Sequence, residues 1–97
     1  MRAFVTPEAR QDLRNIRDFR SQWAPESAQD LIFAILRRLR QVRDFPNSGR
    51  IIPEFQMESL REVLEQGYRI LYEVFPDRVE IFGVISSRQE LVRRDIN

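Results

Sequence analysis

The sequence from Tyr68 to Ile85, YRILYEVFPDRVEIFGVI, decides which fold the chain can adopt. It contains two runs rich in β-branched and aromatic residues, which favour the pleated, half-buried surface of a sheet. Pro76 and Asp77 lie between the runs and supply turn chemistry. We therefore predict a β-hairpin whose apolar surface needs a second layer to shield it from water.

Strict alternation along each run predicts which side chains share a face. In the first run it separates two sets: Tyr68, Ile70, Tyr72 and Val74 on one face, and Arg69, Leu71, Glu73 and Phe75 on the other. In the second run it separates Val79, Ile81, Gly83 and Ile85 from Glu80, Phe82 and Val84.

Two amphipathic helices are predicted upstream of the hairpin. Thr6 and Pro7 form a helix start, and apolar residues then recur with helical spacing at Ala9, Leu13, Ile16, Phe19 and Trp23. Pro25 starts a second helix, whose apolar stripe is Ala28, Leu31, Ile32, Ile35, Leu39 and Val42. The first helix is expected to end near Gln22, and the short link makes the helices an antiparallel pair.

Short strands are predicted at Arg2–Val5 and Leu60–Glu65, and the turn cluster from Phe45 to Arg50 ends the second helix. Residues 51–59 are expected to form a loop or a short extended segment, and residues 88–97 a polar tail. The predicted fold class is therefore α+β: a two-layer sandwich of order β-α-α-β-β-β, with an antiparallel helix pair packed on a mainly antiparallel sheet. Its 97 residues suit a single domain, 1–97.

The composition excludes several kinds of chemistry. The chain has no Cys and no His, so it has no disulfide, no thiol nucleophile and no imidazole acid or base. Its Asp and Glu residues do not cluster with the spacing of metal ligands, so we expect neither a metal nor a cofactor. No apolar run approaches the length of a membrane span or a signal peptide, which predicts a cytoplasmic protein without a membrane partner.

All 16 basic residues are arginine, and the formal net charge is only +1. This balance argues against a broadly polycationic nucleic-acid binder. Residues 1–50 carry ten Arg and six acids (+4), whereas residues 51–97 carry six Arg and nine acids (−3). Arginine suits ion pairs at interfaces, although a G+C-rich genome gives the same bias. The cluster of Arg37, Arg38, Arg40 and Arg43 either complements the helix dipole or forms a partner surface.

Several segments together resemble the RelE/ParE superfamily of type II toxin–antitoxin toxins. They are VTPEARQDLRNI, APESAQDLIFAILRRLRQV, FPNSGRIIPE and LREVLEQGYRILYEVFPDRVEIFGVISSRQEL, and they cover nearly the whole chain. The pattern looks closest to the ParE branch. That resemblance implies a cytoplasmic bacterial toxin that inhibits DNA gyrase, binds a cognate antitoxin in a hetero-oligomer, and contacts operator DNA only through the antitoxin.

One departure from the family pattern keeps other functions open. Ser86 and Ser87 stand where members often carry a histidine, and the chain also has no lysine. RNA cleavage needs a group that accepts a proton, and arginine stays protonated. We therefore favour a non-enzymatic gyrase inhibitor over a RelE-type mRNA endoribonuclease acting on the ribosome. The third alternative is an inactive member that only binds its antitoxin.

Two sets of residues are the candidate sites. The expected target-binding residues are Arg61, Arg69, Arg88, Arg93 and Arg94, and a ribonuclease would use Arg61, Arg69, Arg88 and Tyr68 or Tyr72. The structural alternatives are cross-strand pairing of Arg61 and Arg69 with Glu62, Glu73 or Glu80, and core packing of the tyrosines with hydroxyls reaching solvent. The expected antitoxin-binding residues, which have no assigned place in the core, are Phe19, Trp23, Phe33, Leu36, Phe55 and Met57.

Overall fold

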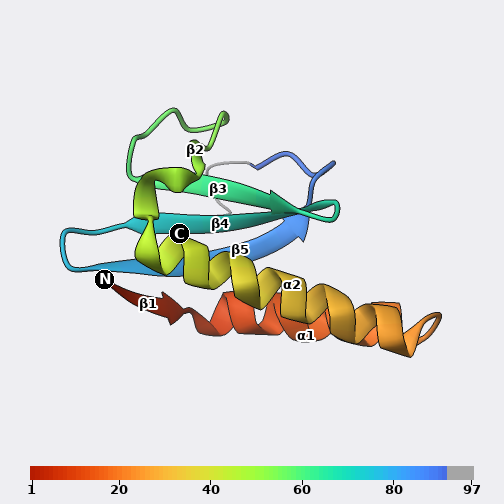
Figure 1. Ribbon diagram of the computed structural model, residues 1–97. Helices are drawn as coiled ribbons and strands as arrows, with labels where there is room; N and C mark the ends of the chain where they lie inside the picture. The colour runs from red at the N-terminus through yellow and green to blue at the C-terminus, as the bar shows by residue number, and fades with distance from the viewer. Residues whose placement is uncertain (92–97) are drawn as a thin grey trace.

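Two helices pack on one face of a five-stranded sheet in the computed structural model, which describes residues 1–91 (Figure 1). The elements are β1 (Arg2–Val5), α1 (Pro7–Ser21), α2 (Pro25–Asp44), the 3-10 turn η1 (Pro46–Ser48), β2 (Arg50–Ile51), β3 (Leu60–Glu65), β4 (Tyr68–Val74) and β5 (Arg78–Ser86). The strand order is β1-β5-β4-β3-β2, and only the β1–β5 pair is parallel. The predicted α+β class is confirmed, and β2 is the short extended piece of the expected loop.

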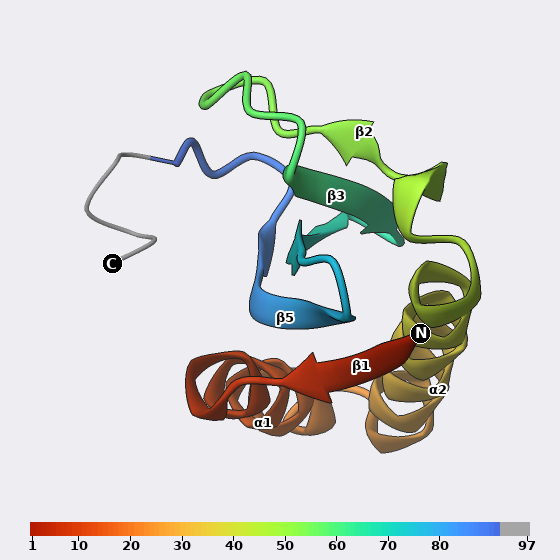
Figure 2. The ribbon, with the colours of Figure 1, turned by 90° about the vertical axis from the view of Figure 1, so that its left-hand side faces the viewer.

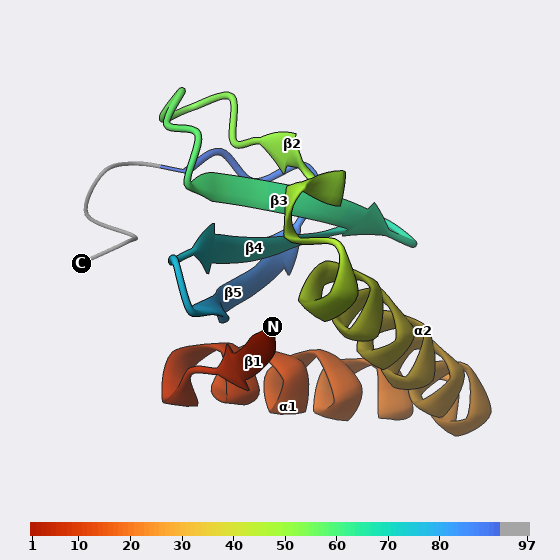
Figure 3. The same cartoon turned by 60° about the vertical axis from the view of Figure 1, so that its left-hand side comes forward.

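The helices begin where the sequence places their starting signals. The Thr6 hydroxyl accepts a hydrogen bond from the Ala9 amide at 3.2 Å, and Pro7 and Pro25 open the two helices. Figure 2 shows both helices on one side of the sheet and the loop after β2 on the other side. Their link, residues 22–24, lies beyond the ends of the strands (Figure 1), and Figure 3 shows α1 below the strands and α2 extending past their ends. None of the helices within residues 1–91 is long and apolar enough to span a membrane.

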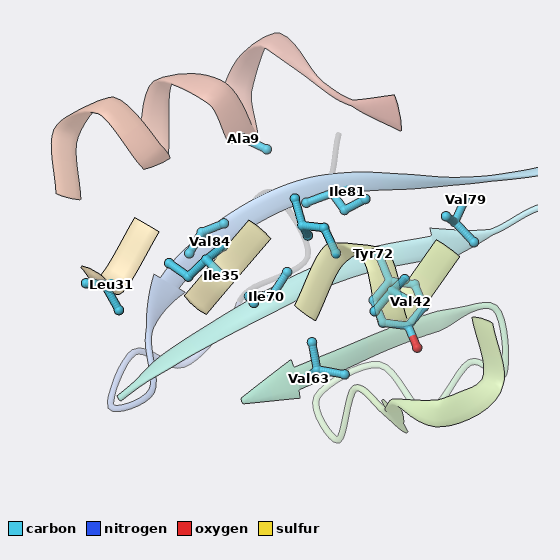
Figure 4. Close-up of a cluster of buried hydrophobic side chains, with 11 residues drawn as sticks. Ala9, Leu31, Ile35, Val42, Val63, Ile70, Tyr72, Val79, Ile81 and Val84 are labelled. Carbon is cyan, nitrogen blue, oxygen red and sulfur yellow. The ribbon is translucent and has the colours of Figure 1, made fainter. Parts of the chain in front are cut away.

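The main core lies between the helices and the sheet. It joins Ala9 of α1 and four α2 side chains to the inner face of β3, β4 and β5 (Figure 4). The β4 side chains in contact with this core are Tyr68, Ile70, Tyr72 and Val74, as alternation predicts. The helical layer therefore stabilises the hairpin by removing its apolar face from water.

A bulge in β5 corrects the predicted alternation of that strand. The register passes over Phe82, because the successive pairs are Leu71 with Gly83 and Tyr72 with Ile81. One extra residue moves every later side chain to the opposite face. Val84 therefore joins Val79 and Ile81 in the main core, instead of facing the other way.

A second, smaller apolar cluster covers the outer face of the sheet, which the sequence analysis did not foresee. It contains Ile52, Leu60, Leu71 and Leu91, with Phe55, Phe82 and Ile85 packed against it. The loop after β2 and the segment after β5 supply its cover. The outer face is thus shielded by irregular chain, and the polar contacts that hold this chain lie beside the cluster.

Candidate functional site

Arg69 lies at the centre of an ion-pair network on the outer face of the sheet. Its Nε donates to Glu62 Oε1 at 2.6 Å, and its two terminal nitrogens donate to the Glu54 carboxylate at 2.6 and 2.7 Å. Glu62 also accepts a hydrogen bond from Arg50. Arg69 is 5% exposed and Glu62 1% exposed, so the two charges neutralise one another inside the protein.

The same network ties the segment after β5 to the sheet. Arg69 Nη1 donates to the Gln89 carbonyl at 2.9 Å, and the Leu91 amide donates to Glu54 Oε2 at 3.0 Å. Hydrogen bonds from Arg69 lower the pKa of Glu54 to about 2, and those of Glu54 and Glu62 raise the pKa of Arg69. Glu54 is therefore only a weak base at neutral pH, and both of its oxygens already accept hydrogen bonds from Arg69 or from the Leu91 amide.

This geometry corrects the expectation that Arg69 faces a target. All three of its nitrogens bind groups of the same chain, and its side chain is buried. Glu62 was one of the cross-strand partners considered from the sequence, and that pairing is confirmed. Glu54 was missed, because it lies in a loop 15 positions before Arg69 and nothing local links the two.

Tyr72 lies on the opposite face of β4, in the main core. Its hydroxyl donates to the Pro46 carbonyl at 2.6 Å and accepts a hydrogen bond from the Gly49 amide at 3.0 Å. The hydroxyl therefore bonds to the turn after α2 instead of reaching solvent, which corrects the sequence interpretation. Burial raises the pKa of Tyr72, so the phenol stays protonated at neutral pH.

The same contact explains the glycine of the FPNSGR segment. A Cβ at Gly49 would collide with the Tyr72 hydroxyl and with the Glu62 carbonyl oxygen. Glycine lets the backbone pass close to the ring. The glycine therefore has a packing role.

The structure does not gather the candidate arginines at one place. Arg61 pairs with Tyr72 across β3 and β4 and donates to the Gly49 carbonyl at 2.9 Å, on the face opposite Arg69. Arg88 is exposed just beyond the end of β5. Arg93 and Arg94 lie outside the described residues. Arg61 and Arg88 are thus the candidates among residues 1–91 that keep any access to a partner.

Exposed apolar side chains gather near the link between the helices. Trp23 is 77% exposed, Phe19 62% and Phe33 50%. A groove of about 460 Å³ lies between the helices here, lined by Arg17, Ser21, Pro25, Gln29, Ile32 and Phe33. Leu36 and Met57 are also exposed, whereas Phe55 packs against the outer cluster, which corrects its expected lack of a place in the core.

The described residues offer no metal site: within 1–91, no three Asp or Glu side chains come together as ligands. Their chemistry is that of ion pairs, an exposed apolar surface and a few accessible guanidinium groups. This is the chemistry of macromolecular binding.

Comparison with known proteins identifies the family. Residues 3–91 match the model described as ParE toxin of type II toxin-antitoxin system, parDE. The chain is 33% identical over 88 residues to "Toxin RelE3" of Caulobacter vibrioides, covering 91% of this chain and 92% of that protein. The fold matches a solved chain titled "Chromosomal ParDE TA system from P. aeruginosa" with a TM-score of 0.75, 21% identity, and coverage of 89% of this chain and 95% of that one. The chain therefore belongs to the ParE toxin family, within the RelE/ParE superfamily of type II toxin–antitoxin toxins.

Proposed function

We propose that this toxin inhibits DNA gyrase in the cytoplasm without catalysing a reaction, and that its cognate antitoxin neutralises it in a hetero-oligomer. Membership of the family implies that antitoxin partner. Contact with operator DNA would then be made through the antitoxin.

The observation that carries the proposal is that Glu54, Glu62 and Tyr72, which could accept a proton in RNA cleavage, are all engaged in contacts within the chain. Cleavage at a ribose 2′-hydroxyl requires a group that accepts its proton. Glu54 and Glu62 are held as ion pairs of Arg69, and the Tyr72 hydroxyl is buried between two backbone groups. These groups stabilise the fold, which supports a toxin that acts by binding.

The proposed target surface is the set of guanidinium groups that remain accessible. Arg88 is exposed, and Arg61 uses one terminal nitrogen for the Gly49 carbonyl while the rest of its side chain is part-buried. We keep Arg93 and Arg94 in this set on the basis of the sequence, and we leave out Arg69. For the antitoxin, the proposed anchors are the exposed apolar residues Phe19, Trp23, Phe33, Leu36 and Met57.

A RelE-type ribonuclease is the second candidate, because the similar Caulobacter protein is named Toxin RelE3. Of the residues expected for that reaction, Arg61, Arg88 and the partly buried Tyr68 keep access among residues 1–91, whereas Arg69 and Tyr72 are buried. A base would then have to come from the ribosome or from another part of the chain. The third candidate is an inactive antitoxin-binding member, consistent with Ser86 and Ser87 in place of the family histidine.

The proposal is tested with purified toxin in two assays run side by side. We expect it to block supercoiling by DNA gyrase and to leave mRNA intact in a translating ribosome extract. Arg88→Gln should weaken gyrase inhibition, whereas the control Arg10→Gln on α1 should not. Cleaved mRNA with normal supercoiling would establish the ribonuclease instead. Normal growth of cells that express the toxin without its antitoxin would establish an inactive member.

A further inference from the structure

The chain turns back immediately after β5, and Arg88 lies in the middle of this turn. The Gln89 amide donates to the Ser86 carbonyl at 3.0 Å, which closes a four-residue β-turn around Ser87 and Arg88. The Ser86 hydroxyl accepts a hydrogen bond from the Arg88 amide at 3.3 Å. The Ser87 amide donates to the Gly67 carbonyl at 2.8 Å, so the turn is also tied to the connection between β3 and β4.

The segment that follows the turn is held by side chains instead of by a neighbouring strand. Arg69 Nη1 donates to the Gln89 carbonyl at 2.9 Å, and the Leu91 amide donates to Glu54 Oε2 at 3.0 Å. The Leu91 side chain is buried in the outer apolar cluster, on the side of the sheet where the loop after β2 lies (Figure 2). The backbone of Arg88 is therefore attached to the sheet both before and after it.

Glu54 is the group that completes the second attachment. One of its oxygens accepts from Arg69 Nη2, and the other accepts from Arg69 Nη1 and from the Leu91 amide. If the carboxylate were removed, Arg69 would still have Glu62 as a partner, and the main core on the other face of the sheet would keep its contacts. Loss of Glu54 should therefore free the segment after the turn and leave the helical layer in place.

The Arg88 side chain is exposed and forms no ion pair with any residue from 1 to 91. A guanidinium group binds a carboxylate or a phosphate most strongly when its fork points in the right direction. A side chain that starts from an ordered backbone also loses less conformational entropy on binding. The internal network around Arg69 thus supplies what an exposed arginine needs to act as a binding group.

We propose that Glu54 is a positioning residue for target binding: through Arg69 and the Leu91 amide it holds the turn from Ser86 to Gln89, so that Arg88 is presented to DNA gyrase in a fixed direction. The inference rests on the function proposed above, which places Arg88 in the target surface. Glu54 is engaged within the chain and would not itself contact the target.

NMR relaxation of the free toxin tests whether Glu54 holds the turn. In the unmodified toxin the backbone amides of Arg88 and Gln89 should have the order parameters of a rigid backbone, about 0.85, and in Glu54→Ala these should fall below about 0.6. The Leu91 amide should exchange at least about tenfold faster in the variant, because it loses its acceptor. Unchanged order of the turn together with unchanged exchange at Leu91 would overturn the proposal, whatever the target is.

A double-mutant cycle tests whether Glu54 acts through Arg88. We expect Glu54→Ala to raise the toxin concentration for half-inhibition of gyrase supercoiling at least about fivefold, whereas Glu58→Ala, an exposed acid in the same loop, should leave it unchanged. In toxin that already carries Arg88→Gln, Glu54→Ala should have at most about a twofold effect, because the group that it positions is gone. Equal effects in the two backgrounds would show a general loss of stability and would overturn the proposal.

All variants are assayed at a temperature at which circular dichroism shows them to be folded, and Glu54→Gln replaces Glu54→Ala if the latter does not fold. Failure of the unmodified toxin to inhibit gyrase would count against the proposed function. The same cycle measured on growth arrest would then decide whether Glu54 acts through Arg88.

Discussion

Arg69 donates hydrogen bonds to two carboxylates and one carbonyl, and these three groups and Arg69 itself belong to four different parts of the chain. The network joins β4 to β3, to the loop after β2 and to the segment after β5. A buried charge is tolerated only when its partners are complete. Removal of one partner should therefore loosen the outer face of the sheet, while the helical side keeps its own core.

Replacement of Glu54 by Gln tests this network and its pH dependence. At pH 7 the variant should lose about 1–3 kcal/mol of unfolding free energy, because Arg69 keeps a weaker, uncharged partner. The pKa of Glu54 is lowered from 4.5 to about 2, so its contribution is complete above pH 4.5 and is lost as the pH falls toward 2. Urea unfolding at several pH values measures the difference between the two proteins, which should be constant from about pH 5 to 8 and narrow below that range.

Glu58→Gln is the matched control, because Glu58 is exposed in the same loop. Its unfolding free energy should stay within about 0.5 kcal/mol of the unmodified value. If the two variants behaved alike, the Glu54–Arg69 pair would have no role in stability.

Removal of the Tyr72 hydroxyl separates a structural role from a catalytic one. Tyr72→Phe leaves the Pro46 carbonyl and the Gly49 amide without their partner, which should cost about 1–3 kcal/mol of unfolding free energy. Growth arrest should persist at a temperature where the variant remains folded. A folded variant that no longer arrests growth would contradict the structural role, and Tyr68→Phe, on the same face of β4, is the control.

At the scale of elements, the helix pair has one face in the core and extends past the sheet at its link (Figure 1). The sheet does not cover the link, so the aromatic residues near it remain exposed. An exposed aromatic group of this kind is typical of a surface that a partner covers. Trp23 makes the surface accessible to experiment, because it is the only tryptophan in the chain.

Tryptophan fluorescence should therefore report on antitoxin binding. The emission of free toxin is expected at the long wavelength of a solvated indole, with a shift to shorter wavelength when the antitoxin covers Trp23. Phe33→Ser should weaken binding through the same surface, and Phe45→Ser, an exposed aromatic beyond the end of α2, is the control. An unchanged spectrum at saturating antitoxin would remove Trp23 from the interface.

The elements themselves were predictable from local patterns, whereas their long-range contacts were not. Helical spacing of apolar residues identified both helices, and runs of β-branched and aromatic residues identified β4 and β5. The strands β1 and β3 were inferred from their neighbours, the helix start after β1 and the hairpin after β3. The bulge at Phe82 has no sequence signal beyond the adjacent glycine, so alternation placed Val84 on the wrong face. The Glu54–Arg69 pair depends on how a loop folds over the sheet, which neighbouring residues do not encode.

For the molecule as a whole, the charge is unevenly distributed although the net charge is +1. The first 50 residues carry a net charge of +4 and include both helices, α1 and α2, with the basic end of α2. Among the acidic residues after position 50, Glu54 and Glu62 form ion pairs with Arg69. An uneven field of this kind steers an oppositely charged partner toward one side of a protein. The helical side should therefore attract an acidic segment before any contact forms.

Association with the antitoxin should consequently depend on salt. We expect the association rate constant to fall about tenfold between 0.05 and 0.5 M NaCl, with a smaller change in the dissociation rate constant. Stopped-flow mixing that follows Trp23 emission measures both. An association rate that does not vary with salt would show that the uneven charge has no part in recognition.

The extra residue in β5 also has a consequence for changes in chain length. If Phe82 were deleted, the pairs Leu71 with Gly83 and Tyr72 with Ile81 would follow one another without interruption, and Val84 would still point into the main core. A deletion at Val79 would instead turn the side chains on one side of the deleted residue to the opposite face of the sheet. Loss of one codon, which usually ruins a central strand, is therefore compatible with this sheet at position 82, and relatives that lack this residue are expected to keep the same core.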